Sequence, residues 1–196
     1  MPGVRPASGP GDDAPGGPVR PAASVLTVID DDLLLTTVHD TGVRRLQHAY
    51  ADVVNRRAWP ELRELFLDDA VTTIDTRGGE PLTFVGGGEI GAFIDTSVAR
   101  FSFFEFVILN AHIAFPDGPG AGTAVSRLYM CEHRQDAGTG RWTNAFGLYH
   151  DRYALDGGRW WFAGRQYHSL ARHAPELEVF PFPDPAPLDV PGAGWR

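Results

Sequence analysis

The stretch TNAFGLYHDRYALDGGRWWFAGRQYHSL, residues 143–170, decides the fold. Apolar and aromatic residues follow a two-residue period on both sides of Asp156-Gly157-Gly158, and that tripeptide is typical of a tight turn. We therefore predict two long strands, Thr143–Leu155 and Arg159–Leu170, joined as an antiparallel hairpin.

The two-residue period also covers the sequence before this hairpin. Phe103–Phe115 and Thr123–Arg134 have the same character, and turn residues follow each of them at Pro116-Asp117-Gly118 and Asp136-Ala137-Gly138. Four long strands in succession predict an antiparallel meander. Because long strands twist, a small sheet of this kind must curl and leave a concave face.

Residues before Phe103 follow helical spacing instead. The elements predicted there are a helix over Thr36–Arg57, a short helix over Glu61–Leu67, a strand over Ala70–Asp75 and a helix over Glu89–Arg100. We read Gly86-Gly87-Gly88 as a turn, because no phosphate-binding Lys follows it. Helices followed by a meander indicate an α+β fold, a curled antiparallel sheet with about three N-terminal helices packed on its concave face. An apolar cavity at the mouth of such a sheet is the expected ligand site.

The ends of the chain differ from its middle. Residues 1–24 are rich in Pro, Gly and Ala and have almost no large apolar side chains, so they cannot bury enough surface to order themselves. We predict three parts: a largely disordered tail and lead-in over 1–35, one domain over 36–172, and a Pro-rich tail over 173–196.

Composition excludes several classes of function. The chain has 196 residues, 43% of them hydrophobic, and a net charge of −8 without a basic stripe, which argues against nucleic acid. It has no Lys for Schiff-base chemistry, and its seven His form no metal-ligand pattern, so we expect neither a metal nor a cofactor. No apolar run reaches the ~20 residues of a membrane span. The single Cys131 cannot form an internal disulfide, which favours a cytoplasmic protein.

Two segments resemble a known family. YADVVNRRAW, residues 50–59, resembles the opening of SnoaL-like proteins, and residues 147–153 with 158–165 are similar to their closing hairpin. These proteins belong to the nuclear transport factor 2-like, or ketosteroid-isomerase-like, superfamily. The resemblance covers about residues 36–170 and implies a conical α+β barrel, usually a homodimer formed through the open sheet. The fold hosts dehydratases, isomerases, polyketide cyclases, epoxide hydrolases and non-catalytic modules.

The resemblance also implies positions for catalytic residues. Dehydratases similar to scytalone dehydratase and bile-acid dehydratase use an Asp near the end of the first helix, a Tyr about one turn earlier, and a His on the first long strand. In this chain Tyr50 matches the Tyr. The Asp position is Asn55 and the His position is Phe106, while His112 lies further along the same strand. The usual acid–base pair is therefore not intact.

Three residues are candidates for catalysis. Tyr50 would donate a hydrogen bond to a carbonyl or enolate oxygen, or else be a core Tyr with a satisfied hydroxyl. His112 would act as a base if its strand face is concave, and would be structural if that face meets a dimer partner. His168 is the second choice for a base, on the expectation that it points into the cavity rather than toward the rim and solvent.

Other residues are candidates for ligand binding. Asn55 would orient a ligand, or else bond to the backbone at the helix end. Strand parity alone leaves the inward face open, although the apolar pair Leu128 and Met130 favours its own side. The full set of candidates is Asn55, Trp59, Phe66, Phe106, Leu128, Met130, Phe146 and Gln166. Asp151 and Arg165 are expected to form a structural ion pair.

These observations favour a cofactor-independent lyase, isomerase or cyclase that transfers protons on a hydrophobic, oxygenated small molecule, with secondary metabolism as one setting for the reaction. The alternative is a non-catalytic module of the same fold that binds a small molecule or a partner enzyme. A third possibility, the small subunit of a ring-hydroxylating dioxygenase, matches no specific motif.

Overall fold

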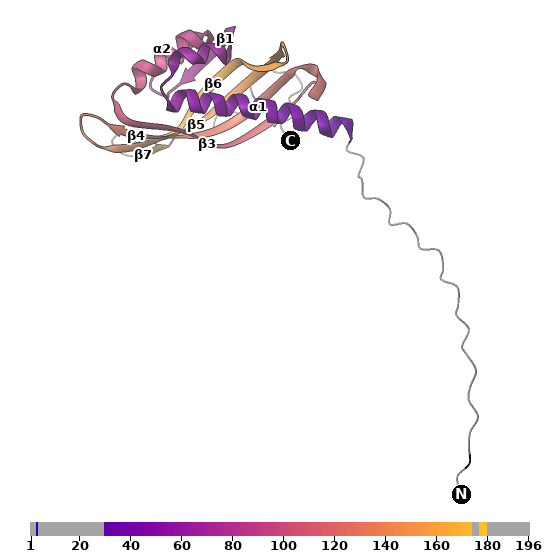
Figure 1. Ribbon diagram of the computed structural model, residues 1–196. Coiled ribbons are helices and arrows are strands. Elements are labelled where there is room, and N and C mark those ends of the chain that lie inside the picture. Colours follow the sequence, from indigo (N-terminus) through magenta and orange to yellow (C-terminus); the bar gives the residue numbers. More distant parts are fainter. Residues whose placement is uncertain (1–2, 4–29, 174–176, 180–196) are drawn as a thin grey trace.

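The computed structural model describes residue 3, residues 30–173 and residues 177–179. A long helix and a short 3-10 helix precede the first strands, a second helix follows them, and long strands complete the chain (Figure 1). The elements are α1 (Asp31–Asn55), η1 (Trp59–Glu64), β1 (Phe66–Asp75), β2 (Leu82–Val85), α2 (Gly86–Val98), β3 (Phe101–Ala114), η2 (Pro119–Ala121), β4 (Thr123–Asp136), β5 (Trp142–Asp156), β6 (Arg159–His173) and β7 (Leu177–Val179).

The strands form one curled, open sheet in the order β2-β1-β6-β5-β4-β3, and β7 pairs with the last residues of β6. The four strands predicted from the two-residue period are all present and pair in sequence as an antiparallel meander. The α+β prediction is confirmed. One pairing differs from it, because β1 runs parallel to β6 and extends the sheet beyond the meander.

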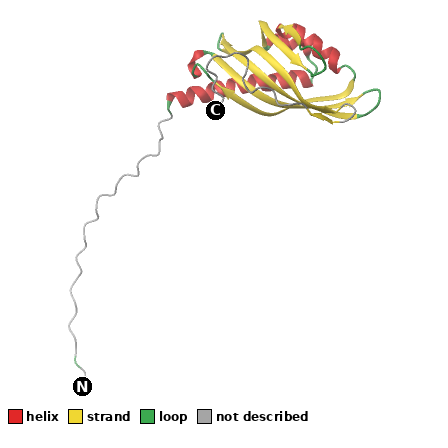
Figure 2. Cartoon of the chain, turned by 180° about the vertical axis from the view of Figure 1, so that it is seen from behind, coloured by secondary structure: helices red, strands yellow, loops and turns green. Residues whose placement is uncertain are grey.

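The helices lie on the concave face of this sheet, with α1 running across it (Figures 1 and 2). The apolar face of α1 buries Val43, Leu46, Val53 and Val54 in the core. The helix begins at Asp31, before the predicted start at Thr36. The Asp30 side chain accepts a hydrogen bond from the backbone N–H of Asp32 in the first turn. This N-terminal cap stabilises the earlier start.

Two predictions for the segment between α1 and β3 need correction. The short helix predicted over Glu61–Leu67 is the 3-10 helix η1. It ends at Glu64, because β1 already starts at Phe66. Gly86-Gly87-Gly88 is not a separate turn, because it forms the first turn of α2. A Cβ on Gly87 would overlap the Leu62 carbonyl of η1, so the glycine lets α2 approach that helix closely.

Side chains of α1 and of the residues just after it bond to the free edge of the sheet. Asn55 uses both ends of its amide on the backbone of Phe106, donating from Nδ2 to the carbonyl at 3.0 Å and accepting from the N–H at 2.6 Å. The Arg57 guanidinium donates to the Phe101 carbonyl at 2.8 Å. These bonds satisfy backbone groups of edge strand β3 that have no neighbouring strand.

The predicted tails lie largely outside the described residues. Within the predicted lead-in, Asp31 already belongs to α1, and β7 lies in the predicted C-terminal tail. None of the helices in the described part of the chain is long and apolar enough to cross a membrane.

Candidate functional site

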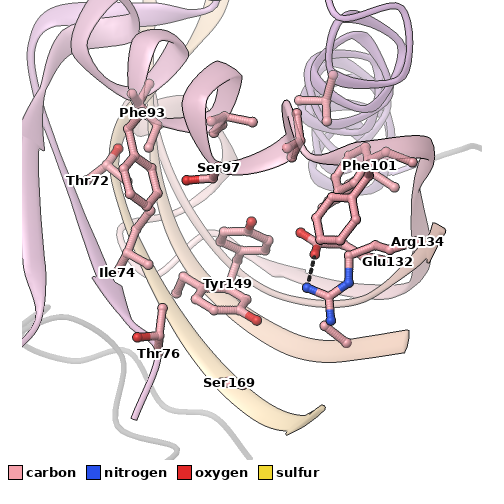
Figure 3. A pocket seen from close by; sticks show the side chains of 18 of the residues that line it. Thr72, Ile74, Thr76, Phe93, Ser97, Phe101, Glu132, Arg134, Tyr149 and Ser169 are labelled. Carbon is pink, nitrogen blue, oxygen red and sulfur yellow. Dashed lines mark ion pairs between the residues drawn. The ribbon is translucent and has the colours of Figure 1, made fainter. Parts of the chain in front are cut away.

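A cavity of about 220 Å³ lies between the concave face of the sheet, the end of α1 and helix α2. Figure 3 shows Tyr149 in its middle, with Thr72, Ile74 and Thr76 of the β1 segment on one side and Phe101, Glu132 and Arg134 on the other. Apolar side chains of α2 and of β3 make up much of the wall, among them Ile90, Phe93, Ile94, Phe104 and Phe106.

Arg165 occupies one end of the cavity, which we call the inner end. Its guanidinium forms a fully buried bidentate pair with Asp151, with distances of 2.7 Å from Nε to Oδ1 and 2.9 Å from Nη2 to Oδ2. Tyr153 donates to the same carboxylate, and Gln47 and Ser126 bond to Tyr153 in turn. The predicted ion pair is confirmed, and the surrounding network fixes the guanidinium in position.

Two phenols flank this guanidinium. The Arg165 Cζ atom lies 4.2 Å from the ring centroids of both Tyr50 and Tyr149, a cation–π sandwich. The two phenols share a hydrogen bond with each other. Burial raises the pKa of both, only partly offset by the charge of Arg165, so both stay protonated at neutral pH and can donate.

Polar atoms at the inner end lack partners within the described chain. Arg165 Nη1 and Thr72 Oγ1 are buried, and neither makes a hydrogen bond. Both residues line the cavity. A buried donor without an acceptor costs about 1–3 kcal/mol, and most such groups in folded proteins are paired. An oxygen atom of a ligand would satisfy both groups.

Glu132 supplies the carboxyl group of the cavity wall. It lies on β4 opposite Phe106 of β3 and Ala145 of β5, in the row of the sheet that faces the cavity. Burial raises the pKa of Glu132, and the positive charge of Arg134 offsets only part of that rise. The Arg134 Nη1 atom is 3.5 Å from Glu132 Oε2, a long contact (Figure 3).

Two of the candidates named from the sequence line this cavity, Tyr50 and Phe106. Leu128 and Met130 point to the same side of the sheet, as their apolar character suggested, but they are buried in the core rather than exposed to the cavity. Phe66 is also a core residue, stacked on Phe162 at 4.7 Å between ring centroids.

The other candidates lie elsewhere. His168 and Gln166 flank Tyr167, which faces the cavity, and so point to the opposite side of β6, where His168 lies 3.9 Å from Asp75. The expectation that they point inward is wrong, because β6 has one extra residue between Phe162 and Gly164 relative to β5, and parity counting from the Trp residues misses it. His112 is exposed, opposite Arg127.

Three further candidates are also outside the cavity wall. Phe146 alternates with Ala145, which lines the cavity, and lies on the opposite face. Asn55 is committed to the backbone of Phe106, which is the structural alternative considered for it. Trp59 is a partly buried residue of η1.

Sequence reasoning missed Glu132, Tyr149 and the second role of Arg165. The sequence did contain a signal for Glu132, because it alternates with Leu128 and Met130 on the same strand and so shares their face. Tyr149 has the parity of Asp151 and follows from the buried ion pair. Neither signal fixes which atoms remain unpaired, since that depends on the packing of α1 and α2.

Comparison with known proteins is consistent with this architecture. The model of the SnoaL-like domain matches residues 38–166. The chain belongs to the SnoaL-like family. No curated protein matches it at the level of whole sequences.

Solved structures share the fold at low sequence identity. A candidate scytalone dehydratase from Novosphingobium aromaticivorans is 15% identical, with a TM-score of 0.61 over 76% of this chain and 91% of that one. The hexachlorocyclohexane dehydrochlorinase LinA-type3 from Novosphingobium barchaimii is 16% identical, with a TM-score of 0.60 over 75% and 93%. An NTF2-like protein with a cystatin-like fold from N. aromaticivorans is 17% identical, with a TM-score of 0.58 over 76% and 92%. This SnoaL-like chain therefore shares the fold of these solved structures.

Proposed function

We propose that this SnoaL-like protein is a cofactor-independent lyase, isomerase or cyclase that moves a proton next to a carbonyl group of a small cyclic molecule. The observation that carries the proposal is that one desolvated carboxyl, Glu132, shares a cavity with Arg165, whose buried Nη1 has no hydrogen-bond partner among the described residues, and with the phenols of Tyr50 and Tyr149. Such a set can remove a proton and stabilise the oxyanion that results.

Glu132 is the group suited to take the proton. A carboxylate whose pKa is raised by burial is a stronger base than an exposed one. His112 and His168 lie outside the cavity, and none of the described cavity-lining residues is His. We therefore assign the proton transfer to Glu132 in place of the two His.

Arg165 and the two phenols are suited to hold the oxygen. When the Cα–H bond breaks, its electron pair moves to the carbonyl oxygen. Arg165 Nη1 and the phenol that does not donate to its neighbour then donate to that oxyanion. Glu132 then returns the proton to another carbon, which isomerises the substrate. If a β-hydroxyl group leaves, Glu132 protonates it as water departs.

The cavity limits the size of the substrate. Its volume of about 220 Å³ is below the roughly 300–1,000 Å³ of sites for drug-sized ligands. Its walls combine aromatic rings with few polar groups, which favours a molecule of one or two rings that carries oxygen.

Deuterium exchange tests the proposal without knowledge of the product. The protein is incubated with 2-tetralone in D₂O, and the loss of the α-proton signals is followed by NMR above the buffer rate. Tyr50→Phe and Tyr149→Phe should each slow the exchange at least about tenfold, in the direction of the ~10²–10³ that loss of an oxyanion donor costs. Tyr129→Phe, on the opposite side of β4, is the matched control and should keep the wild-type rate. Wild-type exchange at the buffer rate would reject the proposal.

The same assay examines the His candidates. His112→Asn and His168→Asn should leave the exchange rate within about twofold, since both side chains lie outside the cavity wall. A steep loss in either variant would restore the assignment made from the sequence.

A non-catalytic binding module is the second candidate. Its support is that Asn55 is held by the backbone of Phe106 at the position where related dehydratases have an Asp. Saturable binding of 2-tetralone without exchange would favour this function.

We also propose a cytoplasmic homodimer that joins through the sheet face opposite the cavity, as the family resemblance implies. On that face Phe103 and Trp142 are exposed, 40% and 57%, and their rings lie 5.1 Å apart. Light scattering should give twice the 21.4 kDa chain mass, and Trp142→Asp should lower it. A monomer at micromolar concentration would contradict the dimer.

A further inference from the structure

The charges of the cavity wall are unevenly distributed. Among the described residues, four guanidinium groups line it, those of Arg100, Arg134, Arg165 and Arg172, against one carboxyl, that of Glu132. Asp151, below the inner end, neutralises Arg165. The remaining three Arg belong to the other end of the cavity, which we call the outer end.

Sheet register fixes the position of this outer end. Arg165 of β6 lies opposite Asp151 of β5. Arg134 of β4 lies opposite Phe104 of β3 and Thr143 of β5, and Thr143 is several residues away from Asp151 along β5. The two guanidinium groups therefore mark opposite ends of one cavity, with Tyr149 and Glu132 in the rows between them.

Arg134 is held in place but not fully paired. Its side chain is only 16% exposed, its Nε is buried and has no hydrogen-bond partner among the residues that the structure describes, and its contact with Glu132 is 3.5 Å long. The ring of Phe101 supports its Cζ atom at 5.3 Å from the centroid. A guanidinium N–H that is buried and free is a strong donor to an anionic oxygen.

A second guanidinium lies against the same ring. The Cζ atom of Arg100 is 4.8 Å from the Phe101 centroid, so both cations contact one aromatic surface. The outer end thus offers two cations and an apolar platform around a small volume.

We propose that the outer end binds a carboxylate, and that the ligand of this protein is a small aromatic or alicyclic acid. The carboxylate accepts hydrogen bonds from Arg134, and the ring lies against Phe101 and Phe104. This inference deepens the proposed function and rests on it: the carbonyl oxygen of the same molecule meets Arg165 at the inner end, so the substrate class is a cyclic oxo acid.

The arrangement also affects Glu132. A bound carboxylate competes with Glu132 for the Arg134 guanidinium, whose present contact is long.

Calorimetric binding of two matched probes tests the carboxylate site. 2-Naphthoate and 2-naphthamide have the same ring and nearly the same shape, and they differ in charge. Wild-type protein should bind 2-naphthoate at least about tenfold more tightly, as expected for a charge-assisted hydrogen bond. Arg134→Gln should abolish that preference, while Arg45→Gln, an exposed site on α1, should keep it. Thermal unfolding of each variant verifies that it is folded.

The outcomes separate the two proposals. Equal or tighter binding of the amide, a preference that survives Arg134→Gln, or no binding of either probe would overturn the carboxylate site. Exchange of 2-tetralone needs no carboxylate, so exchange without naphthoate preference rejects only this inference. Naphthoate preference without exchange rejects the proposed reaction and leaves the binding site.

Discussion

Replacing Asn55 by Asp tests what this position does in the chain. Asn55 donates to the Phe106 carbonyl at 3.0 Å and accepts from the Phe106 N–H at 2.6 Å. A carboxylate keeps the acceptor and loses the donor, and it places a second oxygen against the carbonyl. The substitution introduces the Asp that the resemblance to dehydratases implies at this position. Because one hydrogen bond is lost, it should nonetheless destabilise the fold.

The magnitude follows from these two bonds. Loss of one hydrogen bond costs about 1 kcal/mol, and an unsatisfied, partly buried carbonyl adds about 1–2 kcal/mol. For the described domain we expect a loss of about 2 kcal/mol in the free energy of unfolding, which corresponds to about 4–8 °C in Tm. The deficit should shrink below about pH 4, because the protonated carboxyl regains a donor.

Denaturant and thermal unfolding of Asn55→Asp provide the assay, with Asn110→Asp as the matched control. Asn110 lies on the same strand as Phe106 and is exposed, so that substitution should change stability by less than about 0.5 kcal/mol. If Asn55→Asp is as stable as the control at pH 7, the bonds to Phe106 do not hold the strand edge and the account of this position is wrong.

Three further predictions concern packing and charge. Gly87→Ala should destabilise the fold by about 1–3 kcal/mol in urea unfolding, because its Cβ overlaps the carbonyl of η1, whereas Gly120→Ala, with open space around it, should not. Arg165→Met should cost about 3–5 kcal/mol by leaving Asp151 buried and unpaired, and the Arg165→Met/Asp151→Leu double variant should regain most of that loss; equal stability of the single and double variants would contradict the argument. Burial raises the pKa of Glu132, so the folded state holds its proton more tightly, and stability falls as pH rises from the unfolded pKa through the higher folded one. Glu132→Gln should therefore raise Tm at pH 7–8 and leave it unchanged near pH 4, and an equal effect at both would show that the carboxyl is not desolvated.

Much of the fold was accessible from the sequence because periodicity depends on local residue order. The four long strands start and end close to the predicted positions, and turn residues such as Gly157 and Gly158 mark their boundaries. The parallel pairing of β1 with β6 was not accessible, since it joins segments about a hundred residues apart and leaves no local pattern.

The site was less predictable than the fold for a related reason. Tyr50 was identified because helical spacing places it on the apolar face of α1. His168 was misplaced because one irregularity in β6 exchanges the two faces of the strand, and no turn residue announces it. Glu132 and Arg134 became visible as a pair only once β4 had a defined inner face.

The account depends most directly on Glu132 as the group that moves the proton. The measurement is the rate of α-proton exchange of 2-tetralone in D₂O by Glu132→Gln relative to wild type, with Glu105→Gln, an exposed carboxyl on β3, as control. The account predicts a loss of about 10²–10⁴-fold in Glu132→Gln and an unchanged rate in Glu105→Gln. Exchange by Glu132→Gln at the wild-type rate, in a folded protein, would contradict it.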